Sequence, residues 1–220
     1  MTAPVGTRNR TRSSIAASAT PERDPPRFAR TTLEACATAL LEAVGVGRAD
    51  AALTAELLVE SDLAEHGSHG LSRLPGYLAA IERGAIDPRG VPRVVVDRGA
   101  TATIDGDLAL GQVVARVAAD EVSARAREFG IACVAVQRCG HIGRLAHVTE
   151  RIAAAGQVGI VVANDAGAGQ TVAPPGAREA RLSTNPLAVA APRAAGPPFS
   201  LDMATSVVSH GKVRMRRQRG

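Results

Sequence analysis

Apolar side chains recur at helical spacing through the first patterned part of the chain. Between residues 31 and 45 they share one face, with Thr32 as a candidate N-cap and Gly45 as a stop signal. A second run extends from about 50, where Asp50 is a candidate N-cap, to 63, and a third spans 71–83. Two prolines follow shortly afterwards. The pattern predicts three helices and then a linker.

From about residue 91 onward, short β-branched runs alternate with helical ones. Strands are predicted at 94–96, 101–104, 131–136, 158–163, 187–190 and 199–201, and helices at 112–128 and 144–155. Strand, helix and strand at this spacing indicate βαβ units. Cys36 and Cys133 lie among apolar neighbours and are predicted to be buried, as are the apolar strands at 131–136 and 158–163.

These elements place the chain in the α/β class. We expect a helical subdomain at 31–90 and an α/β domain at 91–213. The segment 1–30, rich in Arg, Ser, Thr, Ala and Pro without a hydrophobic period, is expected to be a disordered extension, and 214–220 a basic tail.

The net charge of +5 is concentrated at the two ends. Residues 1–30 carry +4 and residues 211–220 carry +5, so the remaining 31–210 carries −4, nine less than the whole chain. Because residues 31–210 are mildly acidic and aromatic residues make up only 2% of the chain, we expect no nucleic-acid partner. No apolar run suits a membrane span or a secretory signal, and three cysteines without a CxxC motif suit reduced thiols, so a cytoplasmic protein is expected.

Familiar nucleotide-binding and hydrolase motifs are missing from the sequence. No GxGxxG joins a strand to a helix, and there is no Walker loop, nucleophile elbow or HExxH. A nicotinamide enzyme with this sequence would therefore use a fold other than the Rossmann fold.

The first candidate site is the segment from His66 to Arg73, a glycine-flanked break between two predicted helices. Its structural interpretation is simple: Gly67 ends one helix, Ser68 caps the next, and the histidines are polar loop residues. In the functional interpretation, His69 is a proton donor, because histidine titrates nearest to working pH. Arg73 lies four residues on, one helical turn away, and can bind a carboxylate through two hydrogen bonds.

A second candidate is His141, in a glycine-flanked turn after the strand at 131–136. Active sites of α/β proteins lie at the carboxyl ends of strands, although a plain loop histidine is an equal alternative. A third is Asp202, which follows an apolar strand and could cap a helix or orient a histidine or a ribose. The turn Thr184-Asn185-Pro186 is polar and rigid.

Several of these stretches together resemble the type-2 malate/L-lactate dehydrogenase family. The matching stretches, in family order, are Glu60-Ser61-Asp62-Leu63, Gly67-Ser68-His69-Gly70, Arg73-Leu74-Pro75-Gly76-Tyr77, Asp105-Gly106-Asp107, Leu110-Gly111-Gln112, Gly140-His141-Ile142-Gly143, Thr184-Asn185-Pro186, Asp202-Met203-Ala204-Thr205 and Gly211-Lys212-Val213. The resemblance covers residues 30 to 213, nearly everything between the two basic ends.

The resemblance implies a non-Rossmann NAD(P)-binding α/β domain, NAD or NADP as cofactor, a small-molecule substrate and a homodimer. It implies interconversion of 2-ketoacids and 2-hydroxyacids such as malate or lactate, or reduction of cyclic imino acids. It matches His69 to a proton donor with Ser68 and Asp202 as relay partners, and His141 to a competing acid or base. Arg73 and Ile142 match substrate-binding positions. Cofactor-binding positions are Asn164, Asp165, Thr184, Asn185, Pro186, Asp202, Met203 and Ala204.

Some features depart from the family pattern. Asp165 and Ser183 stand where other residue types are usual, and a basic run replaces the continuation expected after Lys212. We therefore expect an α/β domain that is incomplete at the C-terminus, with exposed apolar surface. A non-catalytic remnant of the family and a metal-dependent hydrolase that uses His66, His69, His141 and Asp202 remain alternative hypotheses.

Overall fold

A computed structural model describes residues 26–164, 170–207, 211 and 213 of the protein. Three helices form its N-terminal part: α1 (Arg30–Ala43), α2 (Arg48–Leu63) and α3 (Leu74–Glu82), with short 3₁₀ turns η1 (Gly67–His69) and η2 (Leu71–Arg73) before α3. The three predicted helices are confirmed. The predicted N-caps Thr32 and Asp50 are wrong, because α1 and α2 begin earlier and neither has a side-chain cap, whereas Gly45 follows the end of α1 as predicted, with a φ of +93°. Asp50 lies instead in the first turn of α2, where a negative charge favours the helix dipole.

The first sheet contains β1 (Arg93–Arg98), β2 (Thr101–Asp105) and β3 (Cys133–Gln137), in that order. β1 and β2 form an antiparallel pair. β2 and β3 are parallel and are connected through α4 (Gly111–Phe129), since parallel neighbours need a crossover. This is the predicted βαβ unit.

The second sheet is antiparallel throughout. It contains β4 (Gly159–Val162), β5 (Leu187–Ala191) and β6 (Phe199–Met203), with α5 (Ala146–Ala154) before β4 in the chain. The expected βαβ unit through α5 is therefore wrong, because β4 pairs with β5 and not with β3. Sequence spacing reports that a helix separates two strands, but not which sheet each strand joins.

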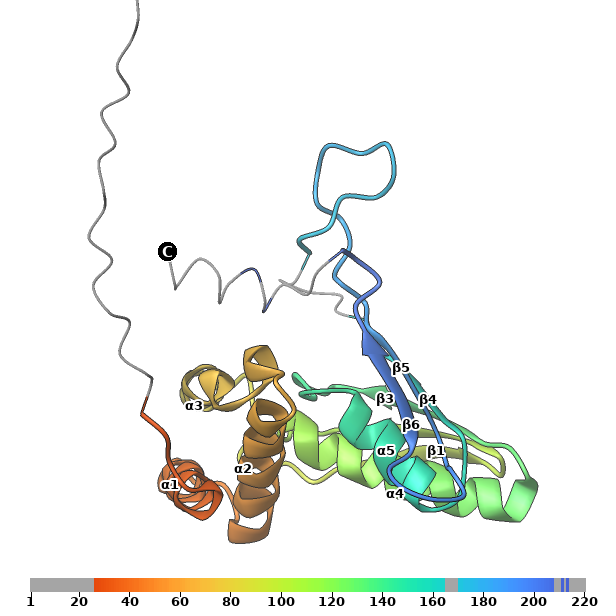
Figure 1. Ribbon diagram of the computed structural model, residues 1–220, viewed down its shortest axis with the longest axis horizontal. Helices are drawn as coiled ribbons and strands as arrows, with labels where there is room; N and C mark the ends of the chain where they lie inside the picture. Colours follow the sequence, from red (N-terminus) through yellow and green to blue (C-terminus); the bar gives the residue numbers. More distant parts are fainter. Residues whose placement is uncertain (1–25, 165–169, 208–210, 212, 214–220) are drawn as a thin grey trace, which may run out of the picture.

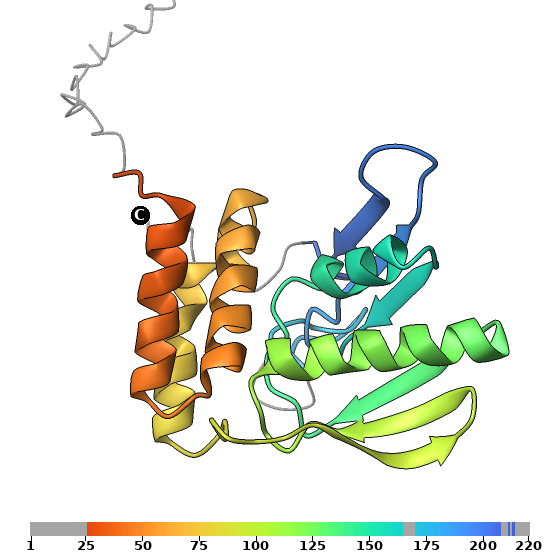
Figure 2. The ribbon, with the colours of Figure 1, turned by 90° about the horizontal axis from the view of Figure 1, so that it is seen from below.

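The elements stack in layers beside the helical part. Figure 2 shows α1, α2 and α3 side by side at the left, with α4 extending away from them above the first sheet. α5 lies between α4 and the second sheet and contacts both (Figure 1). One buried apolar cluster joins the three helices to the start of α4, through Leu41, Leu58, Tyr77, Leu110 and Val113. The start of α4 is thus fixed against α2 and α3.

Two of the predicted strands are much more exposed than expected. Val136 of β3 is 40% exposed, and Ile160 and Val162 of β4 are 67% and 74% exposed. Cys36 and Cys133 are exposed as well, contrary to prediction. Apolar neighbours along the sequence did not imply burial here, because burial depends on which face of each element is covered.

The second sheet has a wholly apolar outer face. α5 packs on the face that carries Ala188, Ala190 and Asp202. The opposite face consists of Ile160, Val162, Leu187, Val189, Ala191, Phe199, Leu201 and Met203, and five of these are exposed by at least 39% of their surface. The predicted exposed apolar surface is therefore present. In the part of the chain that the structure describes, no helix is long and apolar enough to cross a membrane.

Candidate active site

The segment that carries His69 and Arg73 folds back on the end of α2. Gly70 lies so close to Asp62 that a Cβ at this position would be 1.9 Å from the carboxylate Oδ1. Asp62 Oδ2 accepts the Leu71 N–H at 2.8 Å, which closes the loop. Burial raises the pKa of Asp62, and the Leu71 N–H lowers it in turn. A side chain at position 70 would therefore displace the Asp62 carboxylate from the Leu71 N–H, the bond that holds the segment carrying His69 and Arg73 against the end of α2.

The loop that carries His141 packs against the first residue of α4. A Cβ on Gly111 would lie 2.3 Å from the His141 carbonyl oxygen and 2.9 Å from that of Gly140. Because these contacts are with backbone atoms, no side chain can move aside to relieve them. Glycine at 111 therefore permits the close approach that brings His141 to the helical part.

The side chains of the two loops meet. His141 Nε2 lies 2.9 Å from a terminal nitrogen of Arg73, and its Nδ1 lies 2.7 Å from the hydroxyl of Tyr77. The His69 ring stacks on the His141 ring, with centroids 5.4 Å apart and planes inclined by 26°. Ser68 Oγ lies 2.9 Å from His69 Nδ1. The structure thus brings Ser68, His69 and Arg73, from the first candidate segment, together with His141 from the second.

The surroundings of His141 disfavour its charged form. Dense protein packing around the ring, then the Arg73 guanidinium and His69, lower the pKa of His141 to about 3. Although the residue as a whole is exposed, the Arg73 guanidinium in direct contact with the ring disfavours a second positive charge there. His141 is therefore neutral at pH 7.

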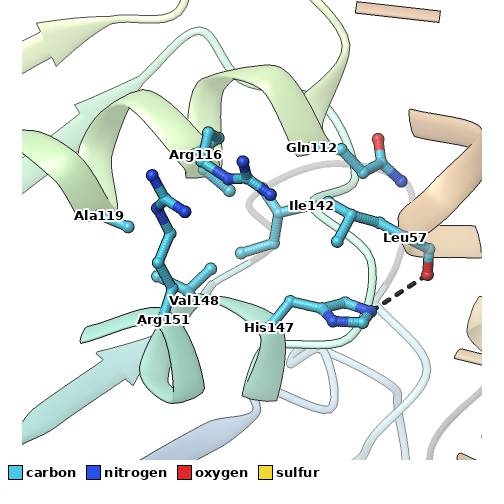
Figure 3. A pocket seen from close by; sticks show the side chains of 9 residues that line it. Leu57, Gln112, Arg116, Ala119, Ile142, His147, Val148 and Arg151 are labelled. Carbon is cyan, nitrogen blue, oxygen red and sulfur yellow. Dashed lines mark hydrogen bonds between the residues drawn. The ribbon is translucent and has the colours of Figure 1, made fainter. Parts of the chain in front are cut away.

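Asp202 lies elsewhere, at the start of α5. From β6, its Oδ2 accepts the Ala146 N–H at 2.9 Å. Asp202 therefore binds the N–H of the first residue of a helix, much as a capping residue does. The helix is α5, however, and not one that follows β6. Its relay role with His69 stays a prediction. Ile142, the other predicted substrate-binding residue, lines a small cavity together with Gln112 and His147 (Figure 3).

The predicted cofactor-binding residues gather at one end of the second sheet. Asn164 follows β4, Thr184-Asn185-Pro186 precede β5, and Met203 and Ala204 stand at the end of β6. Antiparallel pairing brings these ends together, because Leu187 is opposite both Val162 and Met203. Thr184 O accepts the Thr205 N–H at 2.9 Å. The predicted residue Asp165 lies outside the described residues.

Asn185 carries a buried polar atom that has no hydrogen-bond partner among the described residues. Its Oδ1 is buried and accepts no hydrogen bond from the described residues, and its φ of +34° is rare for a residue other than glycine. A buried acceptor left unsatisfied is costly unless something outside the chain donates to it. The atom fits a ligand with an amide or hydroxyl donor, as the carboxamide and ribose of a nicotinamide cofactor have.

His147 forms a second buried cluster that the sequence analysis did not single out. Its Nε2 lies 3.1 Å from Leu57 O and 3.1 Å from Ser61 Oγ, and its Nδ1 lies 3.5 Å from Glu60 Oε2. The order serine, histidine, glutamate resembles a hydrolytic triad. However, Ser61 is 1% exposed and donates its proton to Leu57 O, so it is neither accessible nor available as a nucleophile. We interpret the cluster as a contact between α2 and α5.

Acid should weaken this contact. Burial, then Arg144, lowers the pKa of His147 from 6.5 to about 4. Between these pH values the unfolded chain binds a proton that the folded chain does not, so stability is full above pH 6.5 and falls as the pH drops through this window. We expect the free energy of unfolding to decrease by about 3 kcal/mol at most, as measured by urea unfolding at a series of pH values.

The matched comparison for this prediction is between two histidines. His147→Gln should flatten much of the pH dependence, and the part that remains should come from His141, whose pKa is also lowered. His66→Gln, in the partly exposed loop after α2, is the control for the loss of a histidine side chain. An equal slope in the wild type and His147→Gln would contradict the prediction.

Two hollows lie beside these clusters, between α2, α4 and α5. The smaller, of about 20 Å³, is bordered by Leu57, Gln112, Ile142 and His147 (Figure 3) and has room for about one water molecule. The larger is an open groove of about 590 Å³ lined by acidic and basic side chains, among them Glu60, Arg116, Arg127 and Arg151. Among the described residues, no three His, Cys, Asp or Glu side chains form a group that could hold a metal ion.

Gly111 gives a direct test of how the two loops meet. We expect Gly111→Ala to lower the free energy of unfolding by about 1–3 kcal/mol, because the new methyl group must displace the His141 backbone. Gly76→Ala, inside α3 with open space around it, is the matched control. It should be neutral or stabilise by about 0.5–1 kcal/mol through helix propensity. Urea unfolding of both variants measures the difference, and equal stabilities would contradict the close contact.

Comparison with known proteins agrees with the fold and with the matched motifs. Residues 28–220 match the family model of malate/L-lactate dehydrogenase. The chain is 40% identical over 167 residues to an L-lactate dehydrogenase of Cupriavidus necator, which covers 76% of the chain and 48% of that protein. It is 37% identical over 194 residues to hydroxycarboxylate dehydrogenase B of Escherichia coli K12, which covers 88% of the chain and 54% of that protein.

Solved structures of related dehydrogenases and a reductase resemble the chain as well. Malate dehydrogenase from Pyrococcus horikoshii superposes with a TM-score of 0.81 at 36% identity, covering 86% of the chain and 53% of that protein. The Δ1-piperideine-2-carboxylate reductase of Pseudomonas syringae superposes with a TM-score of 0.81 at 29% identity, covering 89% of the chain and 58% of that protein. The chain belongs to the malate/L-lactate dehydrogenase family, and it spans about half the length of the curated relatives it matches.

Proposed function

We propose that this chain transfers hydride between NAD(P)H and the carbonyl carbon of a 2-ketoacid, which gives a 2-hydroxyacid such as malate or lactate. The observation that carries the proposal is the meeting of Arg73 and His69 around His141. One side chain suits a carboxylate and the other suits a carbonyl oxygen, which are the two polar ends of a 2-ketoacid.

His69 is the proton donor in this proposal, and His141 is not. The Arg73 guanidinium can only donate, so it occupies the Nε2 lone pair of His141, and the pKa of His141 is low. Ser68 contacts His69 Nδ1 and orients the ring. In the reduction, the carbonyl carbon gains the hydride while the oxygen gains a proton from His69, which is left neutral. The products are the 2-hydroxyacid and the oxidised cofactor.

The cofactor would be held at the end of the second sheet by Asn164, Thr184, Asn185, Pro186, Met203 and Ala204, beside Asp202. The resemblance adds Asp165, which lies outside the described residues. Asn185 supports this, because its buried Oδ1 needs a donor. When bound, the nicotinamide supplies the hydride. Whether NAD or NADP is used is a question for the assay. The proposal also includes a homodimer in the cytoplasm, with a small-molecule substrate and no nucleic-acid or membrane partner.

The absorbance of the reduced nicotinamide is used to follow NADH or NADPH oxidation by the purified chain with pyruvate, oxaloacetate, 2-oxoglutarate or a cyclic imino acid. We expect turnover of at least one 2-ketoacid. Turnover of the cyclic imine alone would replace the ketoacid with an imino acid as substrate, which is the activity for which a relative from Pseudomonas syringae is named. Neither turnover nor cofactor binding by calorimetry would contradict the proposal and favour a non-catalytic protein.

A further inference from the structure

The open groove of about 590 Å³ between α2, α4 and α5 is separate from the candidate active site. None of Ser68, His69, Arg73 and His141 lines it. Its volume is within the range of small-molecule sites. Its apolar lining is limited to Leu57, Ala154 and Ala155, and no Phe or Tyr of the described chain borders it, so the groove suits a hydrophilic ligand.

The carboxylates of the groove already have cationic partners. Each lies within 4.0 Å of an arginine nitrogen: Glu56 and Glu60 face Arg30, Asp120 faces Arg151, and Glu150 faces Arg144. Arg30 and Arg144 do not line the groove themselves. The negative charges of the groove are therefore balanced, in large part from outside it.

Arg116 of α4 is half-buried in this groove and has no hydrogen-bond or ion-pair partner among the described residues. Asp120 lies one helical turn away, at a spacing where an ion pair is common. Its Oδ1 instead accepts from Arg151 Nε of α5 at 2.6 Å. Because a charge withdrawn from water is costly without a partner, Arg116 favours an anion from outside the chain.

Arg116 and Arg151 approach the same space from two helices. Both line the groove and also the small hollow of about 20 Å³ beside it. In Figure 3 the Arg151 side chain extends from α5 toward α4, on the side where the Arg116 guanidinium lies. Arg151 binds Asp120 through Nε, so its terminal nitrogens are left to donate to a ligand.

Guanidinium groups that approach from two sides suit a phosphate better than a carboxylate. The oxygens of a phosphate point in different directions, and arginine binds them with strong charge-assisted hydrogen bonds. A carboxylate presents both of its oxygens to one guanidinium, in the planar two-bond arrangement. The small hollow has room for about one water molecule, so an anion of this size would occupy the open groove.

We propose that this groove binds a phosphorylated, hydrophilic small molecule, with its phosphate between Arg116 and Arg151. The rest of the molecule would lie along the polar face of α4, in the direction of Ser123 and Arg127, which also line the groove. The inference does not depend on the proposed hydride transfer, because no residue of that reaction is part of the groove.

The phosphate site would nevertheless adjoin the candidate active site. Gln112 and Ile142 line the small hollow together with Arg116 and Arg151. Gln112 Nε2 donates to the Tyr77 hydroxyl oxygen at 2.8 Å, and Ile142 directly follows His141 in the chain. These two side chains separate the groove from the cluster around His141.

Calorimetry with the purified chain tests the binding without any substrate or cofactor, at an ionic strength held constant with chloride. Ribose 5-phosphate should bind saturably with a Kd on the order of 1 mM, and inorganic phosphate should bind more weakly. Ribose and succinate, which lack a phosphate, should give no saturable heat. The absence of saturable binding by both phosphates would overturn the proposal, and so would succinate binding as tightly as ribose 5-phosphate.

Arginine variants locate the site. Arg116→Gln and Arg151→Gln should each weaken ribose 5-phosphate binding about tenfold to a hundredfold, the effect of a lost charged hydrogen bond. Arg116 has no partner to lose, so Arg116→Gln keeps the test valid if Arg151→Gln does not fold. Ribose 5-phosphate should also raise the urea midpoint of the wild type but not that of Arg116→Gln.

Arg127→Gln is the matched control. Arg127 is an exposed arginine on the same helix and in the same groove, also without a recorded partner among the described residues, but three helical turns from Arg116, roughly 16 Å along the axis. This distance exceeds the screening length at about 0.1 M salt, so its loss should change the Kd by less than about twofold. Equal weakening in all three variants would mean general attraction to a basic surface and would overturn the site.

Discussion

His69→Gln is expected to lower kcat for 2-ketoacid reduction by about 10²–10⁴, which is the usual contribution of a general acid. Glutamine keeps a polar group beside Ser68 but cannot give up a proton at neutral pH. KM should change little, because the contact with the carboxylate is assigned to Arg73. Steady-state kinetics with a saturating reduced cofactor measures both constants.

Two other histidines provide the comparison. His66→Gln lies in the same loop, with its ring centroid 6.5 Å from that of His69, and should leave kcat unchanged. His141→Gln should mainly raise KM, because the ring holds Arg73. The reverse pattern, with a kcat loss of about 10²-fold or more only in His141→Gln, would assign the acid to His141 and refute our assignment of His69.

The sequence predicted the helices and strands well and their environment poorly. Every predicted helix and strand has a counterpart in the structure, because 3.6-residue and two-residue periods are local properties. Whether β4 joins the sheet of β3 depends on contacts between distant segments, and so does the burial of Cys133. No local pattern encodes these contacts.

In the candidate site, too, local signals were found from the sequence and contacts between distant segments were not. His69, Arg73 and His141 were found because glycines flank them in breaks between elements, which is a local signal. Tyr77 and Gln112 were quoted only as parts of matched motifs. One signal could have found Gln112: it is a polar residue beside Val113 and Val114 at the start of a helix, where an apolar side chain would be expected. Tyr77 is the only tyrosine in the chain, but this alone does not indicate a role.

Arg73→Ala is expected to raise KM for the 2-ketoacid about tenfold to a hundredfold, because the loss of a charged hydrogen bond costs about 1.5–3 kcal/mol. The affinity for NADH or NADPH, measured by calorimetry without substrate, should change little, since the predicted cofactor residues belong to the second sheet. The variant also removes the donor that faces His141 Nε2, so some of the effect should come from the release of that ring.

Arg73→Lys distinguishes charge from shape. Lysine keeps the positive charge but not the planar guanidinium. A guanidinium can bind a carboxylate through two hydrogen bonds while one of its terminal nitrogens contacts His141. It should therefore recover only part of the lost affinity. Arg83→Ala, at the exposed end of α3, is the control for a change in surface charge and should leave KM unchanged. If Arg73→Ala instead abolished cofactor binding and spared KM for the ketoacid, Arg73 would belong to the nucleotide site, and its assignment to the substrate carboxylate would be wrong.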